Sequence, residues 1–225
     1  MCGRFTLTAE ADEIREVFEI SDTSNYEWEA RYNIAPTQTV AAVLYNSDKQ
    51  RELRSLYWGL IPSWAKDTKI AAKLINARAE TLAEKPSFRS AFKRKRCLVL
   101  ADGFYEWKRI EKKKQPYYFQ LQNKQPFAFA GLWEQWHPDD ENITSCTIIT
   151  TDANKVLQPI HHRMPVMLQQ QDYERWLDPL QETEILQQLL QPYPAEEMSA
   201  YAVSTKVNNP LHSSPDCIAP EREEN

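Results

Sequence analysis

The sequence predicts a single α+β domain of curved, barrel-like antiparallel sheets with peripheral helices. Strand-like runs outnumber helical ones, and most of them follow one another through short polar or proline-containing connections. The 225 residues are enough for one sizeable core. No internal repeat or long linker divides the chain, so we expect residues 1–225 to form one domain that ends in a flexible tail after about residue 210.

A first helix is predicted over residues 9–19. Thr8 precedes it and belongs to a residue type that caps helix N-termini. Ile14 and Phe18 are spaced so that they fall on one face of this helix. The polar segment RYNIAPTQ (31–38) that follows is typical of a turn.

Short apolar runs with polar boundaries predict the strands. The expected strands cover 39–45, 52–60, 96–101, 104–110, 116–122, 127–133, 144–151 and 199–204. Residues 61–69 predict a loop, and 79–92 an interrupted helix. KKKQP (112–116) is typical of a hairpin connection, and two late helices are expected over 171–177 and 182–190.

The composition argues against a secreted, membrane or zinc-finger protein. The mean hydropathy is −0.65, and no apolar run approaches the ~18 residues that a membrane span needs. The first residues lack the basic and apolar regions of a signal peptide. The four cysteines, at 2, 97, 146 and 217, show no C-x-x-C spacing. We therefore expect a cytoplasmic protein with reduced thiols and no bound metal.

Charge is distributed unevenly along the chain. Residues 85–114, here called the basic stripe, hold 11 Lys and Arg against 3 Asp and Glu, although the whole chain has a net charge of −5. Charge runs are often only solvated faces, but a net +8 on an acidic protein favours binding to a polyanion, and nucleic acid is the expected one. The densest run is Lys93, Arg94, Lys95 and Arg96.

Cys2 is the first candidate for catalysis. Removal of an initiator Met before a small residue leaves a free α-amine beside the thiol, with reference pKa values of about 7.7–8.0 and about 8.5. Such an aminothiol can form an imine with an aldehyde and then close a thiazolidine ring through sulfur. The alternative is that Cys2 is simply a small buried apolar residue.

Two further residues are candidates for proton transfer. His161 stands in QPIHHRMPVML, where the residues alone do not distinguish it from His162. Glu106 lies in DGFYEWK, where alternation places it on one strand face with Phe104 and Lys108. It is either part of a solvated sheet face or a carboxylate in a cleft, its pKa raised by aromatic neighbours until it can move protons.

Several donors and aromatic rings complete the set of candidates. Amide and guanidinium groups of this kind hold phosphates or carbonyl oxygens, and an indole in a polar loop can stack on a base. The residues concerned are Arg4, Asn33, Trp64, Asn76, Arg78 and Arg163.

These motifs, in this order, resemble the SRAP family, the SOS response-associated peptidase-like proteins that shield abasic sites in DNA. The matching segments are MCGRF, RYNIAPTQ, YWGLIPSWAKD, LINARAET, CLVLADGFYEWK, KKKQPYYF, FAGLWE, IITTDAN, IHHRMPVML and VSTKVNN, from residue 1 to about 209. The resemblance implies binding of single-stranded DNA with abasic sites and a covalent crosslink through Cys2. It also implies the family's antiparallel α+β fold.

The resemblance assigns the site residue by residue. Cys2, Asn76, Glu106 and His161 match the catalytic set, and His161 is preferred to His162 by the pattern I-H-x-R-x-P. The positions expected around the DNA are those of Arg4, Asn33, Trp64, Arg78 and Arg163, together with the basic stripe.

In the chemistry that we expect, the Cys2 amine attacks C1′ of the abasic sugar and His161 protonates the departing ring oxygen. Glu106 carries protons to and from the amine, and Asn76 positions the Cys2 backbone or a sugar hydroxyl. No cofactor is required, and we expect a monomer that is associated with the nucleoid when bound to DNA. Removal of the chain's own first residue and a lyase-type strand cleavage are compatible with this chemistry.

Two other functions remain possible on the sequence alone. An N-terminal-nucleophile amidohydrolase would also use Cys2, and a non-covalent module for single-stranded DNA would use only the basic stripe.

Overall fold

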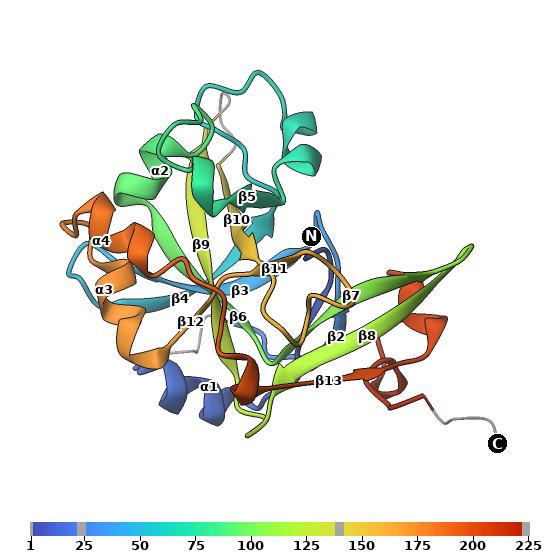
Figure 1. Ribbon diagram of the computed structural model, residues 1–225. Coiled ribbons are helices and arrows are strands. Elements are labelled where there is room, and N and C mark those ends of the chain that lie inside the picture. Colours follow the sequence, from blue (N-terminus) through green and yellow to red (C-terminus); the bar gives the residue numbers. More distant parts are fainter. Residues whose placement is uncertain (1, 22–25, 138–141, 222–225) are drawn as a thin grey trace.

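A closed five-stranded barrel forms the centre of the computed structural model, which describes residues 2–21, 26–137 and 142–221 (Figure 1). Its strands pair in the order β4-β3-β6-β9-β10, and β10 closes the ring by pairing with both β9 and β4. The barrel strands are β3 (Thr39–Tyr45), β4 (Arg51–Trp58), β6 (Arg96–Ala101), β9 (Phe127–Trp136) and β10 (Ile143–Asp152). The β10–β4 pairing is parallel, and the other pairings in the ring are antiparallel.

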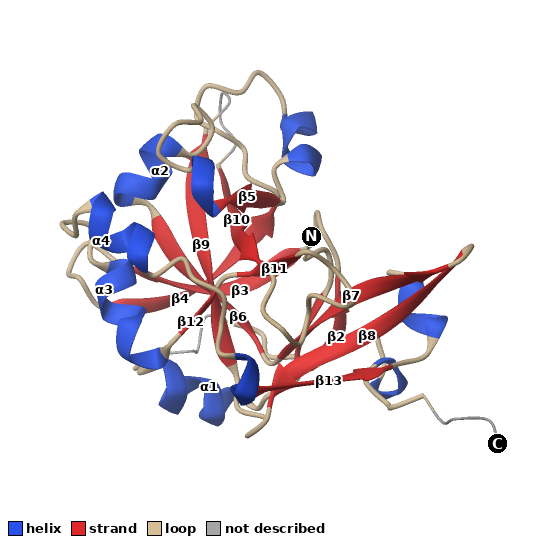
Figure 2. Ribbon diagram, in the orientation of Figure 1, coloured by secondary structure: helices blue, strands red, loops and turns tan. Residues whose placement is uncertain are grey.

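Burial of the barrel strands on both faces explains their nearly continuous apolar sequences. Every residue of β6 is buried, as are Val40–Leu44 of β3. Helices cover one side of the barrel (Figure 2), where Trp176 donates a hydrogen bond from Nε1 to the Cys97 carbonyl, at 3.0 Å. The helices are α1 (Ala11–Phe18), α2 (Arg89–Arg94), α3 (Tyr173–Leu177) and α4 (Thr183–Gln188).

A second sheet, ordered β13-β8-β7-β1-β2, packs against the barrel. Its contact with the barrel is aromatic: the ring of Phe5 lies 5.1 Å from Trp58 and 5.6 Å from Phe129, and the ring of Phe104 lies 6.0 Å from Phe129. The strands are β1 (Phe5–Leu7), β2 (Arg31–Ile34), β7 (Gly103–Ile110), β8 (Lys113–Leu121) and β13 (Met198–Ala202).

Two short strands border the end of β10. β5 (Asn76–Arg78) runs parallel to β10, and β11 (Arg163–Pro165) pairs with it antiparallel. Thr150 is the residue of β10 that faces both strands, opposite Arg78 on one side and Pro165 on the other. The segments that carry Asn76 and His161 therefore flank one strand. A further short strand, β12 (Met167–Leu168), pairs with β9.

The buried carboxylate of Asp102 fixes the N-terminal segment. It accepts hydrogen bonds from the Thr6 hydroxyl, from the Thr8 amide and hydroxyl and from the Ala9 amide. Thr8 is thereby engaged away from the helix, so the prediction that it caps α1 is wrong. The helix begins after Glu10, without a side-chain cap.

The predicted fold class is confirmed, and the bounds of β3 and β6 agree with the predicted strands 39–45 and 96–101. Three local predictions are wrong. Residues 31–34 form β2 rather than a turn, and most of KKKQP belongs to β8. Residues 211–221 do not form a flexible tail, since Val203 bridges to Pro220 and the Glu221 amide donates to the Ala202 carbonyl at 2.8 Å.

Across the described residues, the structure has no helix of sufficient length and apolarity to span a bilayer.

Candidate active site

Cys2 lies three residues before the start of β1 and is completely buried. The antiparallel register pairs Phe5 with Phe104, and the Tyr105 amide donates to the Arg4 carbonyl at 3.0 Å, so the chain before β1 runs beside the central part of β7. From the other side, Asn76 on β5 donates from Nδ2 to the Cys2 carbonyl, at 2.8 Å. The backbone of Cys2 is therefore held between two strands that are distant in sequence.

The thiol of Cys2 shares an electrostatic environment with Glu106. Burial, and then the negative charge of Glu106, raise the pKa of the Cys2 thiol far above its ordinary value. Glu106 lies on β7 and is only 3% exposed, so the interpretation of a solvated sheet face is wrong. The thiol therefore stays protonated at neutral pH, near a carboxylate that could accept its proton.

His161 lies in the loop before β11. Its Nδ1 lies 3.0 Å from the Arg163 amide nitrogen, which donates to it, and 3.1 Å from the Arg163 carbonyl oxygen. The ring stacks on His162 with centroids 4.6 Å apart. Because Nδ1 is held by the backbone, proton transfer by His161 would use Nε2.

Arg163 anchors the loop that carries His161 to neighbouring segments. It is 7% exposed, and its guanidinium pairs with both carboxylate oxygens of Glu80 at 2.7 and 3.0 Å and with Asp152 at 2.8 Å. A further bond reaches the Thr150 carbonyl at 2.6 Å. The hydrogen bond from Arg163 lowers the pKa of Glu80. These bonds engage the guanidinium inside the protein, and a contact between Arg163 and DNA stays a prediction.

Arg4 and Asn33 hold the C-terminal segment. Arg4 donates from Nη1 to Asn33 Oδ1 at 2.8 Å and to the Val207 carbonyl at 2.7 Å. Asn33, 2% exposed, donates from Nδ2 to the carbonyls of Val207, Asn209 and His212 at 3.2, 3.0 and 2.7 Å. These bonds tie Arg4 and Asn33 to the C-terminal segment, and a contact of either residue with DNA stays a prediction.

The basic stripe is not continuous in space. One part lies on α2, and the other on the β7–β8 hairpin, at the opposite side of the molecule in Figure 1. Lys93 and Arg94 are exposed at the end of α2, and Lys95 pairs with Glu134.

Arg96 corrects the interpretation of the stripe most clearly. It is 3% exposed, and its guanidinium donates to the carbonyls of Phe92, Trp176 and Asp178. Burial lowers the pKa of Arg96 to about 10, so it remains charged at neutral pH. This residue joins α2 and α3 to the barrel and does not present its charge to DNA.

Two predicted contacts remain at the surface. Trp64 is 58% exposed, and Arg78 is exposed at the end of β5, two residues after Asn76. Sequence reasoning did not identify Asp102 or Glu80 as supports of the site. An acidic residue directly after the apolar run CLVLA could have indicated Asp102. The residues next to Glu80 in sequence do not indicate its pairing with Arg163.

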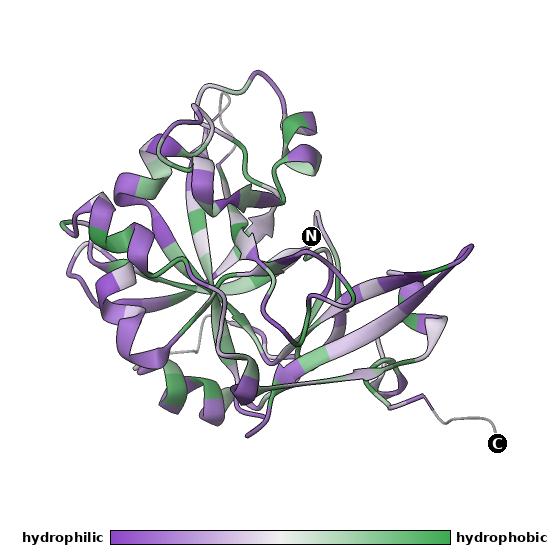
Figure 3. Ribbon diagram, in the orientation of Figure 1, coloured by the Kyte–Doolittle hydropathy of each residue, from purple (hydrophilic) through white to green (hydrophobic). Residues whose placement is uncertain are grey.

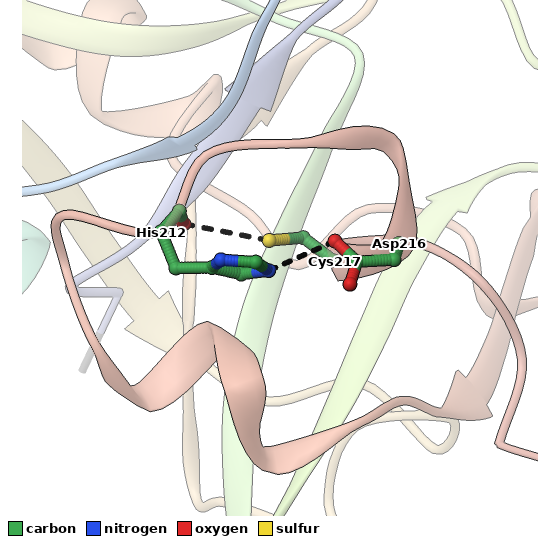
Figure 4. A group of neighbouring side chains, drawn as sticks. All are labelled: His212, Asp216 and Cys217. Carbon is green, nitrogen blue, oxygen red and sulfur yellow. Dashed lines mark hydrogen bonds and ion pairs between the residues drawn. The ribbon is translucent and has the colours of Figure 1, made fainter.

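One group of potential metal ligands occurs in the part of the chain that the structure describes: His212, Asp216 and Cys217, with ligand atoms within 4.8 Å of one another (Figure 4). Protein hydrogen bonds already account for this arrangement. Asp216 pairs with His212 at 2.8 Å and with Lys206 at 2.8 Å, and the Cys217 thiol donates to the His212 carbonyl at 3.5 Å. We interpret the group as a set of hydrogen bonds that stabilises the fold of the C-terminal segment.

Comparisons with known proteins agree on one family. A family model described as SOS response associated peptidase (SRAP) matches residues 1–210. The Bacillus subtilis protein named abasic site processing protein YoqW is 49% identical over 222 residues, which cover 97% of this chain and 99% of that protein. The Xenopus tropicalis abasic site processing protein HMCES is 33% identical, over 97% of this chain and 78% of its own length. A crystal structure of a Bacteroides thetaiotaomicron protein superposes with a TM-score of 0.88 at 29% identity, covering 98% of this chain and 100% of that one.

Proposed function

The chain belongs to the SRAP family, and we propose that it processes abasic sites in DNA by forming a covalent bond to them through Cys2. The observation that carries this proposal is the environment of Cys2. Asn76 holds its backbone carbonyl at 2.8 Å, and the charge of Glu106 acts on its thiol. Removal of Met1 would add a free α-amine at this fixed position.

The bond-forming steps need no cofactor. The amine adds to the C1′ aldehyde of the ring-opened sugar, and the carbinolamine loses water to give an imine. The thiol then adds across the C=N bond: sulfur bonds to C1′, and the thiol proton ends on nitrogen. The product is a five-membered thiazolidine, and one water molecule is released in total.

The side chains around Cys2 suit the proton transfers in these steps. We assign to His161 the protonation of the ring oxygen as the closed sugar opens, through Nε2. Glu106 accepts the proton of the amine and, during ring closure, that of the thiol. Asn76 positions the Cys2 backbone through its carbonyl. The same acid–base groups support removal of Met1 and, when no thiazolidine forms, lyase-type cleavage of the strand by β-elimination.

We infer that the substrate is single-stranded DNA, in which an abasic sugar is accessible. The surface groups that support this are the indole of Trp64, which can stack on a base, and the charges of Arg78, Lys93 and Arg94. Lys95 contributes less, since it already pairs with Glu134. Covalent capture would shield the lesion during a DNA damage response such as the SOS response.

Our first prediction tests the aminothiol directly. The parent protein is incubated with a uracil-containing oligonucleotide pretreated with uracil glycosylase, and the products are followed on a denaturing gel and by intact-mass spectrometry. We expect a heat-stable adduct whose mass is the sum of the two reactants less one water. Cys2→Ser keeps the amine, so it should give only a labile imine that borohydride can trap.

Protein prepared with Met1 retained is the matched control, because its Cys2 thiol is unchanged while its amine is blocked as an amide. It should form no adduct. A stable adduct from this form would place the bond on another residue. Binding by the parent without any shifted band would instead favour the non-covalent module, and glutamine hydrolysis would favour the amidohydrolase.

A further inference from the structure

The outer part of the β7–β8 hairpin is a two-stranded ribbon that projects from the body of the molecule (Figure 1). On one edge, β1 pairs with β7 only at Gly103 and Phe104. On the other edge, β13 pairs with β8 only from Tyr117 onward. The last backbone bond on this edge runs from the Val203 amide to the Pro116 carbonyl, at 3.1 Å, so beyond the Trp107–Pro116 pair the hairpin continues without a third strand among the described residues. An isolated ribbon adds little stability, so a binding role is the better explanation of its length.

The two faces of this ribbon have different surroundings. On the face of Tyr105 and Trp107, the C-terminal segment covers the sheet: Tyr105 packs with Val203 and Val207, and Trp107 donates from Nε1 to Asn208 Oδ1 at 2.7 Å. The opposite face, here called the Glu106 face, begins in the main core with the stacked rings of Phe104 and Phe119.

Alternation and register give the order of side chains outward along the Glu106 face. The cross-strand pairs are Glu106 with Tyr117, Lys108 with Gln115, and Ile110 with Lys113. A catalytic carboxylate at the base is therefore followed by lysines and an isoleucine toward the tip. At ~3.3 Å per residue, Ile110 lies roughly 13 Å from Glu106 along the strand.

The chemistry of the Glu106 face fits a nucleic acid strand. Among the described residues, neither Lys108 nor Lys113 makes an ion pair or a hydrogen bond through its side chain. Ile110 is 48% exposed beside them, on an otherwise hydrophilic hairpin end (Figure 3). Basic groups that track phosphates, interleaved with apolar or aromatic groups that meet bases, are the pattern of single-strand binding sites.

We propose that the Glu106 face of the outer β7–β8 hairpin binds the DNA strand on one side of the reacting nucleotide, with Lys108 and Lys113 on its phosphates and Ile110 and Tyr117 against its sugars and bases. This inference rests on the proposed function, because it takes DNA as the ligand of the Glu106 site. A span of roughly 13 Å corresponds to about four nucleotides at the ~3.4 Å rise of a stacked strand.

The hairpin supplies its own matched control for our second prediction. Lys108→Gln with Lys113→Gln removes two charges from the Glu106 face, and Arg109→Gln with Lys114→Gln removes two from the opposite face of the same ribbon. Binding of an intact, fluorescently labelled single strand is measured by anisotropy over a range of KCl concentrations. The first variant should lower the slope of log K against log salt by about 1.4, at ~0.7 per lost contact. The second should leave the slope unchanged.

Equal slopes for the two variants, or an unchanged slope for both, would overturn the inference. Abasic oligonucleotides trimmed to the lesion on one side or the other give a second test. On the full-length abasic oligonucleotide, the first variant should crosslink more slowly than the parent. This difference should disappear when one flank is removed and persist when the other is removed. A difference that persists with either flank removed would refute the one-sided placement. Failure of the parent to crosslink at all would contradict the proposed function instead, so the two failures are distinguishable. Equal thermal midpoints of all variants would show that they fold.

Discussion

Burial of Cys2 matters to its chemistry as much as the presence of its thiol. A reactive cysteine usually has a lowered pKa, whereas burial and the charge of Glu106 raise the pKa of this one. The proposed reaction is compatible with a neutral thiol, because the amine attacks first and sulfur adds only once the imine has formed. The thiol proton must then have an acceptor, and the carboxylate that perturbs the thiol is the natural one.

Our third prediction therefore concerns the proton carriers. Glu106→Gln keeps the shape of the side chain but cannot accept a proton, so crosslinking should slow by about 10²–10⁴-fold if Glu106 is the general base. His161→Ala should slow the reaction with the closed abasic sugar more than the reaction with a small aldehyde that is already open. Quench-flow or timed denaturing gels give both rates, and parental rates in both variants would refute the assignment.

At the scale of single elements, the junction of α2 and β6 shows that adjacent basic residues can have different structural roles. Four consecutive basic residues have three different environments: Lys93 and Arg94 are exposed, Lys95 is paired, and Arg96 is buried against backbone carbonyls. The strand begins at Arg96, and its side chain lies between β6 and the two helices α2 and α3 that cover it.

This arrangement gives our fourth prediction. Arg96→Ala would remove the guanidinium donor from the buried Phe92 and Trp176 carbonyls and one of the two donors to the Asp178 carbonyl, so it should lower the free energy of unfolding by about 2–4 kcal/mol. Lys93→Ala, three residues away in sequence, should change stability by less than about 0.5 kcal/mol but lower the salt slope of DNA binding by about 0.7. Urea unfolding and salt titration separate the two effects. An Arg96→Ala protein of parental stability would contradict the buried role.

The elements that could be predicted are those whose neighbours in sequence determine them. Apolar runs bounded by polar turns are sufficient for β3 and β6, but β2, β5 and β11 are only three or four residues long and owe their extended form to the strands beside them. Likewise, resemblance was sufficient to select Cys2, Asn76, Glu106 and His161 as candidates. The internal hydrogen bonds of Arg4, Asn33 and Arg163 could not be predicted, because each depends on partners far away in sequence, such as Val207 for Arg4.

For the molecule as a whole, the buried thiols set an alkaline limit on stability. Burial raises the pKa of both Cys97 and Cys146, whereas an unfolded chain ionises its thiols near pH 8.5. Above that pH the unfolded state binds fewer protons than the folded state, so stability is fully present below about pH 8.5 and is lost as the pH rises.

Our fifth prediction follows from this sign. The free energy of unfolding should fall between pH 8.5 and 9.5 by up to about 1.4 kcal/mol per pH unit for each buried thiol. Cys146→Ala should flatten the dependence by one such contribution, whatever it does to stability at pH 7. Urea titrations across this pH range give the slope, and an identical slope in the variant would show that Cys146 does not contribute.

The link between Arg4 and the Val207 carbonyl has a consequence for the order of events during synthesis. A ribosome adds about 5–20 residues per second, so roughly 10–40 s separate the appearance of Arg4 from that of the segment that holds it. Throughout this interval the first residues cannot be fixed as they are in the finished protein. The segment that carries Arg4 therefore reaches its final position only after the C-terminal residues have been made, and the hydrogen bond to Val207 is among the last contacts of the fold to form.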